Sequence, residues 1–391
     1  MVRSSALVVG RDPCVKRGNC ASFTLVEMLV ATVILVIMIG ILFSITQETS
    51  RAWKNTTGNV EIFRSSKAAF DTMTRTLSQV TLNTYYDYAY LSNGTNAFVS
   101  LGSSTIPTTY ARNSDLQIVS GQGSTLLTGL TSYTAVTHAV FFQAPLGISA
   151  NTANAGMGSL LNACGFYVAY GPDPSAPGFM PTTPRYRYRL MQFTQPSDNL
   201  SIYASGNKGT ANWYLPFIQK DVTTPPATAD FVLAENVIAL IVLPKLAVND
   251  EVAAEAAYGT SVTGTLGTAL APNYTYDSST VGKGGTLSAN GVSPYPLLNS
   301  FNQMPPVFQI TMVAIDEASA IKLCTTSTAP NAQLGLNGLF TQAQNLQSDL
   351  QQLENNLAAA PGNVAGNKVP LNFRVFQTEV AIRGAKWTSD N

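Results

Sequence analysis

The stretch Phe23–Phe43 reads FTLVEMLVATVILVIMIGILF, and Glu27 is the only charged residue between Arg17 and Glu48. From Met28 to Phe43, Thr32 is the only polar interruption. Extended to Ile45, the run forms a helix of about 34 Å, long enough for a hydrocarbon core of roughly 30 Å. The sequence therefore predicts one transmembrane helix over residues 23–45.

A carboxylate inside an apolar run costs about 2.5–3.5 kcal/mol at the bilayer centre, so Glu27 is a candidate functional residue. A basic leader precedes the run, with one acidic residue among four basic ones: Arg3, Arg11, Asp12, Lys16 and Arg17. Basic residues before an apolar span favour a cytoplasmic N-terminus and an exported remainder.

Three simpler interpretations compete. A secretory signal has a short apolar region followed by a small-x-small cleavage site, whereas here Ala21 and Ser22 precede the apolar run. A lipoprotein signal fails for the same reason, because Cys20 also lies before the run. A plain membrane anchor fits the length but leaves Glu27 unexplained.

The segment Phe23-Thr24-Leu25-Val26-Glu27, followed by Met28–Ala31, resembles the processing segment of type IV pilins and type II secretion pseudopilins. The resemblance implies that prepilin peptidase removes residues 1–22 between Ser22 and Phe23 and methylates the new amine of Phe23. It also implies that Glu27 pairs with the N-terminal amine of a neighbouring subunit during assembly. Such a pair would offset the desolvation of both charges. The family usually has glycine before the cut, where this chain has Ser22.

The rest of the chain has the composition of a large folded body. Among 391 residues, 11% are charged and 45% apolar, far from a disordered composition. Basic residues are scattered, which argues against a nucleic-acid partner. Arg185, Arg187 and Arg189 alternate with apolar residues as on a strand; they form either an anion-binding face or, as is commoner, a solvated strand face.

The cysteine and histidine residues do not indicate a metal-binding or catalytic site. Cys14 and Cys20 fall in the leader, so Cys164 and Cys324 remain as either one disulfide or two buried thiols. The single His138 lies in an apolar strand-like run and is expected to be a packed core residue. No metal site and no cofactor are expected.

Periodicity predicts an α+β fold: a long N-terminal helix, membrane-spanning and then amphipathic over residues 46–82, packed on a mainly antiparallel β head at 83–391. The head is expected to contain a loop-rich insertion at 249–304 and an inserted helix at 333–359, near the C-terminus. Strands are expected at Asp115–Ser120, His138–Gln143, Gly165–Tyr170, Tyr186–Phe193, Phe231–Leu243, Val307–Ile315 and Asn372–Arg383. Tyr85–Tyr90 is either a ring-packed sheet rim or a sugar-stacking surface.

Outer segments carry a further resemblance. Glu235–Pro244 and Pro305–Ala320 are similar in plan to the minor pseudopilin J family. Arg185–Pro196 and Phe376–Trp387 resemble the Verru_Chthon cassette protein C family of pseudopilin-like proteins.

The sequence contains no H-E-x-x-H, G-x-S-x-G, Walker-type or C-x-x-C motif. The acidic pair Asp316-Glu317 is better explained as charge at a helix N-terminus than as a catalytic site. We therefore expect a non-enzymatic structural subunit of a type II secretion or type IV pilus-like assembly, as a minor component at its tip or in its initiating complex. Its expected partners are prepilin peptidase and other pseudopilins. It would be a single-pass inner-membrane protein with a cytoplasmic N-terminus and a head in the periplasm or a cell-surface filament. Alternatives are a surface-displayed adhesive module and an exported enzyme with a pilin-type anchor.

Overall fold

The computed structural model describes residues 24–92, 95–97, 109–130, 133–154, 156–172, 185–204, 213–218, 230–265, 267–280, 295–323, 329–359 and 371–388. The chain divides between Thr56 and Thr57 into two compact units, each described by itself below. The expected leader, residues 1–22, and Phe23 lie outside the described residues.

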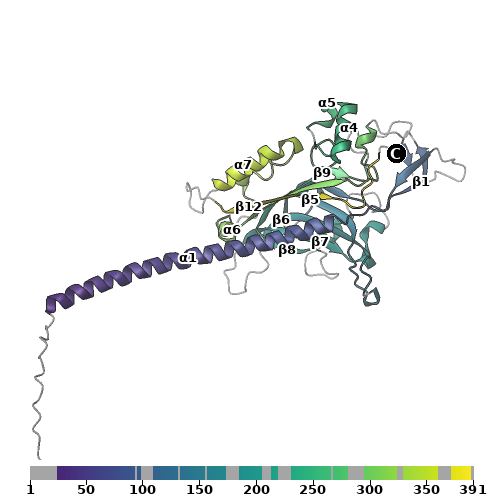
Figure 1. Cartoon of the computed structure of the whole chain (residues 1–391). Helices are drawn as coiled ribbons and strands as arrows, with labels where there is room; N and C mark the ends of the chain where they lie inside the picture. The colour runs from purple at the N-terminus through teal and green to yellow at the C-terminus, as the bar shows by residue number, and fades with distance from the viewer. Residues whose placement is uncertain are drawn as a thin grey trace, which may run out of the picture. The chain divides into compact units, whose positions relative to one another are not determined.

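Helix α1, Leu25–Leu77, contains 53 residues (Figure 1). Its first 26 residues, Leu25–Ser50, are long and apolar enough to cross a membrane, and none of this stretch is buried. Two hydroxyls in this apolar stretch are satisfied within the helix: Thr32 donates to the Leu29 carbonyl and Thr46 to the Leu42 carbonyl, each at 2.8 Å. The stretch therefore presents apolar side chains with no unpaired hydroxyl at these two positions.

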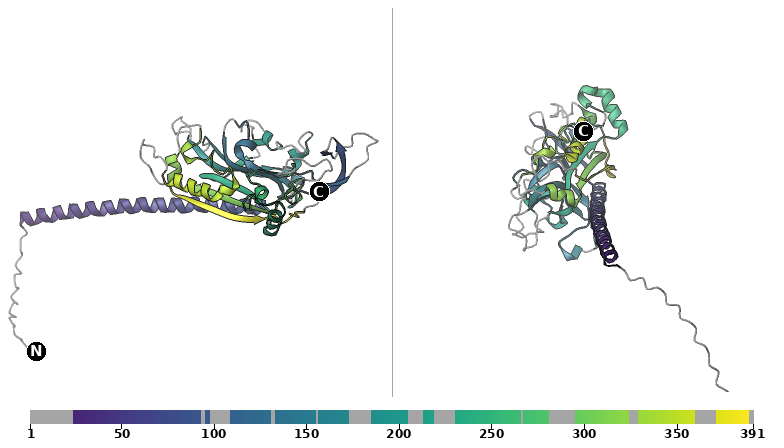
Figure 2. Two further views of the ribbon diagram at one scale, coloured as in Figure 1. Left: turned by 90° about the horizontal axis from the view of Figure 1, so that it is seen from above. Right: turned by 90° about the vertical axis from the view of Figure 1, so that its left-hand side faces the viewer.

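In the second unit, the C-terminal end of α1 packs on a sheet of the same chain. Ala69, Phe70, Met73 and Leu77 are buried at helical spacing. The Phe70 ring lies 5.8 Å from that of Phe376 on strand β12, Phe373–Ala381, which runs beside this part of α1 (Figure 2). This confirms the expected amphipathic face.

The helix ends at Leu77 rather than at residue 82. Two following N–H groups bond to carbonyls three residues back, Gln79 to Thr76 at 3.1 Å and Val80 to Leu77 at 3.2 Å, which tightens the last turn. Thr81 then bridges to Gln143. Val80 is buried after the helix has ended, which is why its spacing suggested a longer helix.

Three antiparallel sheets form among the described residues, in the orders β10-β4-β5-β6-β7-β8, β12-β11-β9 and β2-β1-β3. Their strands are β1 Tyr85–Ser92, β2 Thr95–Ala97, β3 Thr109–Asn113, β4 Val119–Gln122, β5 Thr134–Pro145, β6 Leu161–Pro172, β7 Tyr186–Gln195, β8 Asp230–Glu235, β9 Val237–Lys245, β10 Tyr276–Asp277, β11 Val307–Ile315 and β12 Phe373–Ala381. The α+β class with antiparallel sheets is as expected.

The main core lies where β9 packs across β5, β6 and β7. Strands β5, β6 and β9 are buried along almost their whole length. A bulge in β5 places Thr137, with φ of +55°, and His138 beside β9. Thr137 Oγ1 accepts from Leu240 N at 3.0 Å and His138 Nδ1 from Val242 N at 3.1 Å. These bonds satisfy main-chain donors on the edge of the three-stranded sheet.

The expected strand Phe231–Leu243 is two strands in two sheets. It breaks at Asn236, whose φ of +61° turns the chain from β8 into β9. Asparagine tolerates this left-handed conformation better than most residues, and the turn is held by a bond of 2.9 Å from Asn236 N to the Tyr188 carbonyl. Asp115–Ser120 is also only partly a strand, because β4 begins at Val119.

The expected helix 333–359 begins only at Leu346, as α7, Leu346–Ala358. The preceding residues form two 3-10 turns and bends. Gly335 and Phe340 have positive φ, 70° and 59°, which an α-helix cannot contain. The seam residues Leu346, Leu350, Leu353 and Leu357 are buried, so α7 packs on this protein's own core.

The region 249–304 contains more structure than the expected loop-rich insertion, including α4, Val248–Tyr258. Its alanines favour a helix but give little apolar periodicity. The remaining short elements are α2 Gly123–Leu126, η1 Thr152–Asn154, η2 Ser197–Asn199, η3 Ser201–Tyr203, α3 Leu215–Ile218, α5 Thr260–Thr263, η4 Pro296–Leu298, α6 Glu317–Leu323, η5 Ala332–Leu334 and η6 Ala343–Asn345.

Candidate functional site

The start of α1 is a reciprocal pairing of Thr24 and Glu27. Oε2 of Glu27 accepts from the main-chain N and from Oγ1 of Thr24, both at 3.0 Å, and Glu27 N donates to Thr24 Oγ1 at 3.3 Å. Met28 N bonds to the Thr24 carbonyl at 3.2 Å, so Thr24 is the N-cap residue and Glu27 the third residue of the helix. This is a capping box, which satisfies donors that every helix leaves unpaired at its start.

The capping box fixes where the helix begins relative to the expected cut. Phe23, expected to be the first residue after cleavage, directly precedes the N-cap residue. Glu27 lies in the first turn, where the helix dipole favours a negative charge. The pairing is absent from the expectations above, although its signal, T-x-x-E at 24–27, is readable. Ser22 and Phe23 lie outside the described residues, so their roles stay predictions.

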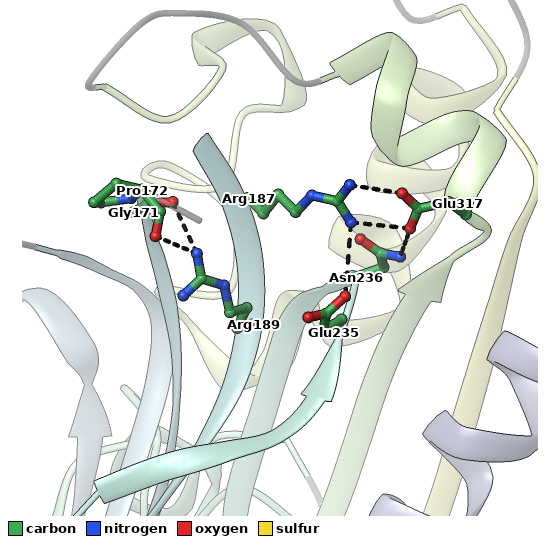
Figure 3. Close-up of polar contacts among 7 residues, drawn as sticks. All are labelled: Gly171, Pro172, Arg187, Arg189, Glu235, Asn236 and Glu317. Atoms are coloured by element: carbon green, nitrogen blue, oxygen red, sulfur yellow. Dashed lines mark hydrogen bonds and ion pairs between the residues drawn. The ribbon is translucent and has the colours of Figure 1, made fainter. Parts of the chain in front are cut away.

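A second polar cluster lies in the head, around Arg187 on β7 (Figure 3). Its guanidinium group pairs twice with Glu317, Nη1 to Oε2 at 3.0 Å and Nη2 to Oε1 at 2.7 Å. Nη1 also lies 3.6 Å from Oε2 of Glu235. Asn236 Nδ2 donates to Glu317 Oε2 at 2.8 Å. The Arg187 side chain is only 11% exposed, so this cluster binds β7, the β8–β9 turn and α6 together.

Arg189 reaches the other way, toward the end of β6 (Figure 3). It is buried and donates to the carbonyls of Gly171 and Pro172. The expectation of an anion-binding or solvated arginine face is therefore wrong at Arg187 and Arg189, because Arg187 is only 11% exposed, Arg189 is buried, and the terminal nitrogens of both bond to groups of the same chain. Arg185 is exposed and precedes β7.

Asp316 and Glu317 open α6, as expected from the sequence. Asp316 Oδ1 accepts from Ser319 N at 2.7 Å, and its Oδ2 accepts from Asn372 Nδ2 at 2.9 Å. Asp316 therefore caps the start of α6, whereas Glu317 forms the ion pair with Arg187. No group of three potential metal ligands occurs among the described residues.

His138 is fully buried and its ring packs on Tyr274, 4.4 Å between centroids, which confirms a core histidine. Cys164 is buried and has no disulfide partner among the described residues, and burial raises the pKa of its thiol to about 12. Cys324 lies outside the described residues, so their pairing stays a prediction.

The tyrosine cluster lies on β1 and β3. Tyr86, Tyr88 and Tyr110 are 58%, 49% and 62% exposed. Tyr88 and Tyr110 are paired across the two strands with their rings 4.9 Å apart. These rings are largely open to solvent rather than packed beneath other elements.

One family model matches the chain: the prokaryotic N-terminal methylation motif, over residues 17–43. The chain therefore carries the signal found at the start of type IV pilin-like proteins, and Thr24, Glu27 and most of the apolar helix lie within it. Neither the comparison with curated proteins nor that with solved structures gives a match. The likeness to known proteins thus covers the motif at residues 17–43 and does not extend to the head.

Proposed function

We propose that this chain is a pilin-like, non-enzymatic structural subunit that prepilin peptidase cleaves between Ser22 and Phe23 and methylates on the new amine. The observation that carries the proposal is the methylation motif at residues 17–43, with Glu27 at the fifth position after the expected cut. We also propose that the chain is related to minor pseudopilin J-like proteins and to the Verru_Chthon cassette protein C family.

The apolar surface of α1 supports assembly in a membrane. Large side chains from Leu25 to Ile45 are at least 49% exposed, an arrangement that is stable only in lipid or against other apolar helices. These exposed apolar residues lie on every side of the helix. This surface supports the proposal of a single-pass inner-membrane location with packing against the corresponding helices of other pseudopilins. The basic residues before the span favour a head on the exported side.

The size of the head supports a place at the tip of a type II secretion or type IV pilus-like assembly. Among its described residues, the unit from Thr57 to Asn391 has two sheets that sandwich a core and a further three-stranded sheet. A subunit repeated along a thin filament has to pack its head against identical neighbours, whereas a tip subunit has no such restriction above it.

The test is mass spectrometry of the N-terminal peptide. In a host with active prepilin peptidase, we expect a chain that begins at Phe23 and is one methyl group heavier than its sequence. In a matched host with a catalytically inactive peptidase, the leader should remain. An intact leader in both hosts would contradict the proposal.

A second candidate is a surface-displayed adhesive module carried by a pilin-type anchor. The exposed rings of Tyr86, Tyr88 and Tyr110 favour it, since tyrosine is a frequent residue of binding surfaces. Alanine replacement of all three should abolish adhesion but leave processing and assembly unchanged. If adhesion is unaffected, this candidate fails.

A further inference from the structure

An open pocket of about 470 Å³ lies beside β10 in the head. Its polar lining comes from three places in the chain: the segment around β10, the loop before β11 and the turn before α7. The side chains that decide its chemistry are Asn273, Thr275, Asp277, Thr280, Ser300 and Gln342. Leu270 and Pro272 supply apolar surface. The volume is within the range of small-molecule sites, roughly 300–1,000 Å³.

The wall of the pocket is held in place from behind. Oδ1 of Asp277 accepts three hydrogen bonds, from Gln117 Nε2 at 2.8 Å, Ser279 N at 2.8 Å and Ser279 Oγ at 2.7 Å. Gln117 is itself buried. Tyr274 is fully buried under His138, with φ of +62°. Because Tyr274 anchors this segment in the core, its neighbours Asn273 and Thr275 lie at the pocket.

The turn that carries Gln342 is fixed to the same wall. Ala343 N bonds to the Pro272 carbonyl at 2.7 Å, and Ala343 is buried. Gln342 next to it is exposed. The two sides of the pocket therefore keep their separation without a ligand, which lowers the ordering cost of binding.

Several polar atoms of the lining have no partner among the described residues. They are Oδ2 of Asp277, Nδ2 of Asn273, Oγ1 of Thr275 and the side-chain amide of Gln342. One is an acceptor, one a donor, and the hydroxyl and the amide supply both functions. This mixture matches groups that donate and accept at once, as hydroxyls do.

The charged groups of the lining limit the classes of ligand that the pocket can bind. The lining holds one carboxylate and no lysine, arginine or histidine, so an anion would find no compensating charge. A calcium-like cation takes six to eight oxygen ligands, and Asp277 is the only carboxylate here. We propose that this pocket binds an uncharged sugar of one or two rings, its vicinal hydroxyls bonding to Asp277, Asn273 and Gln342.

The test uses the full chain in a detergent without a sugar headgroup and saturation-transfer difference NMR. The probes are glucose, galactose, N-acetylglucosamine and maltose, with glucuronate as an anionic comparison. We expect saturation transfer to at least one uncharged sugar and none to glucuronate. Gln342→Ala and Asp277→Asn should each lower the affinity for that sugar at least about tenfold, because each substitution leaves polar groups of the complex unpaired.

Gln344→Ala is the matched control, because Gln344 is exposed, lies two residues away and is not part of the lining. It should bind like the parent chain. The proposal is overturned if none of the four uncharged sugars shows saturation transfer, if glucuronate binds as well as they do, or if Gln342→Ala and Asp277→Asn both keep the parent affinity. None of these results depends on leader cleavage.

Discussion

The main-chain N–H of Val242 on β9 donates to Nδ1 of His138 on β5, over 3.1 Å. Because Nδ1 accepts, the proton of the neutral imidazole is on Nε2, which lies 2.9 Å from the Phe340 carbonyl. One buried ring therefore joins both main sheets to the turn before α7. Desolvation lowers the pKa of His138 to about 4.

The fold should lose stability in mild acid through His138. Its folded pKa lies below the ordinary value of about 6.5, so its contribution is complete above pH 6.5 and is lost as pH falls toward 4. The loss amounts to about 3 kcal/mol of unfolding free energy at pH 4. Urea unfolding of the detergent-solubilised chain between pH 7.5 and 4 measures it.

Carboxylates titrate over the same range, so the control is His138→Gln, which keeps a donor in place of Nε2–H and does not titrate. It should be less stable at pH 7.5 but show a shallower decline toward pH 4. Equal declines in the two proteins would exclude His138 as the source.

The twofold contact of Arg187 with Glu317 should contribute measurably to the stability of the head. Arg187→Gln removes the pair and leaves Glu317 partly buried without its cation, so we expect a loss of about 1–3 kcal/mol in urea unfolding. Lys67→Gln is the comparison, since the Lys67–Asp71 pair is more than half exposed on both sides and should contribute less than about 1 kcal/mol. Equal effects of the two substitutions would contradict the assignment.

Elements with strong local patterns could be predicted from the sequence. Val307–Ile315 is β11 residue for residue, because its length and its β-branched residues favour a buried strand over a helix. The turn at Asn236 could not be predicted from the apolar residues that flank Glu235 and Asn236, because asparagine permits the left-handed conformation without requiring it and tertiary contacts select it here. The arginine partners were equally inaccessible: Glu317 is 130 residues from Arg187.

The start of α1 also has a local signal in the sequence. Thr24 and Glu27 have the spacing of a capping box, a signal that needs no tertiary information. The start of α7 was the opposite case. Leu339 and Ala343 continue the leucine spacing backwards, yet Gly335 and Phe340 adopt positive φ and interrupt the helix.

The leucine seam of α7 should be required for folding of the head. Leu353 is 1% exposed, so Leu353→Ala should lower the unfolding free energy by about 2–5 kcal/mol through lost burial and a cavity. Gln352→Ala, on the exposed face of the same helix, should change it by less than about 0.5 kcal/mol. If Leu353→Ala kept its stability and lost only self-association, α7 would be an interface between subunits instead.

Assembly should depend on the charge of Glu27 rather than on its capping role. Glutamine at the third helical position still completes a capping box, so Glu27→Gln keeps the start of α1 and removes only the charge. A neutral side chain also enters the membrane at lower cost. We therefore expect normal insertion and leader cleavage, but at least about tenfold less co-purification with partner pilin-like subunits, because an amine in low dielectric would lose its counter-charge.

Two variants at Thr24 separate the two roles. Thr24→Ser keeps a hydroxyl at the N-cap and should assemble like the parent. Thr24→Val removes the hydroxyl that bonds to Glu27 and should cost about 1 kcal/mol of helix stability at its first turn, while the carboxylate stays available to a neighbouring amine. If Thr24→Val abolished co-purification and Glu27→Gln did not, the geometry of the helix start, and not its charge, would determine assembly.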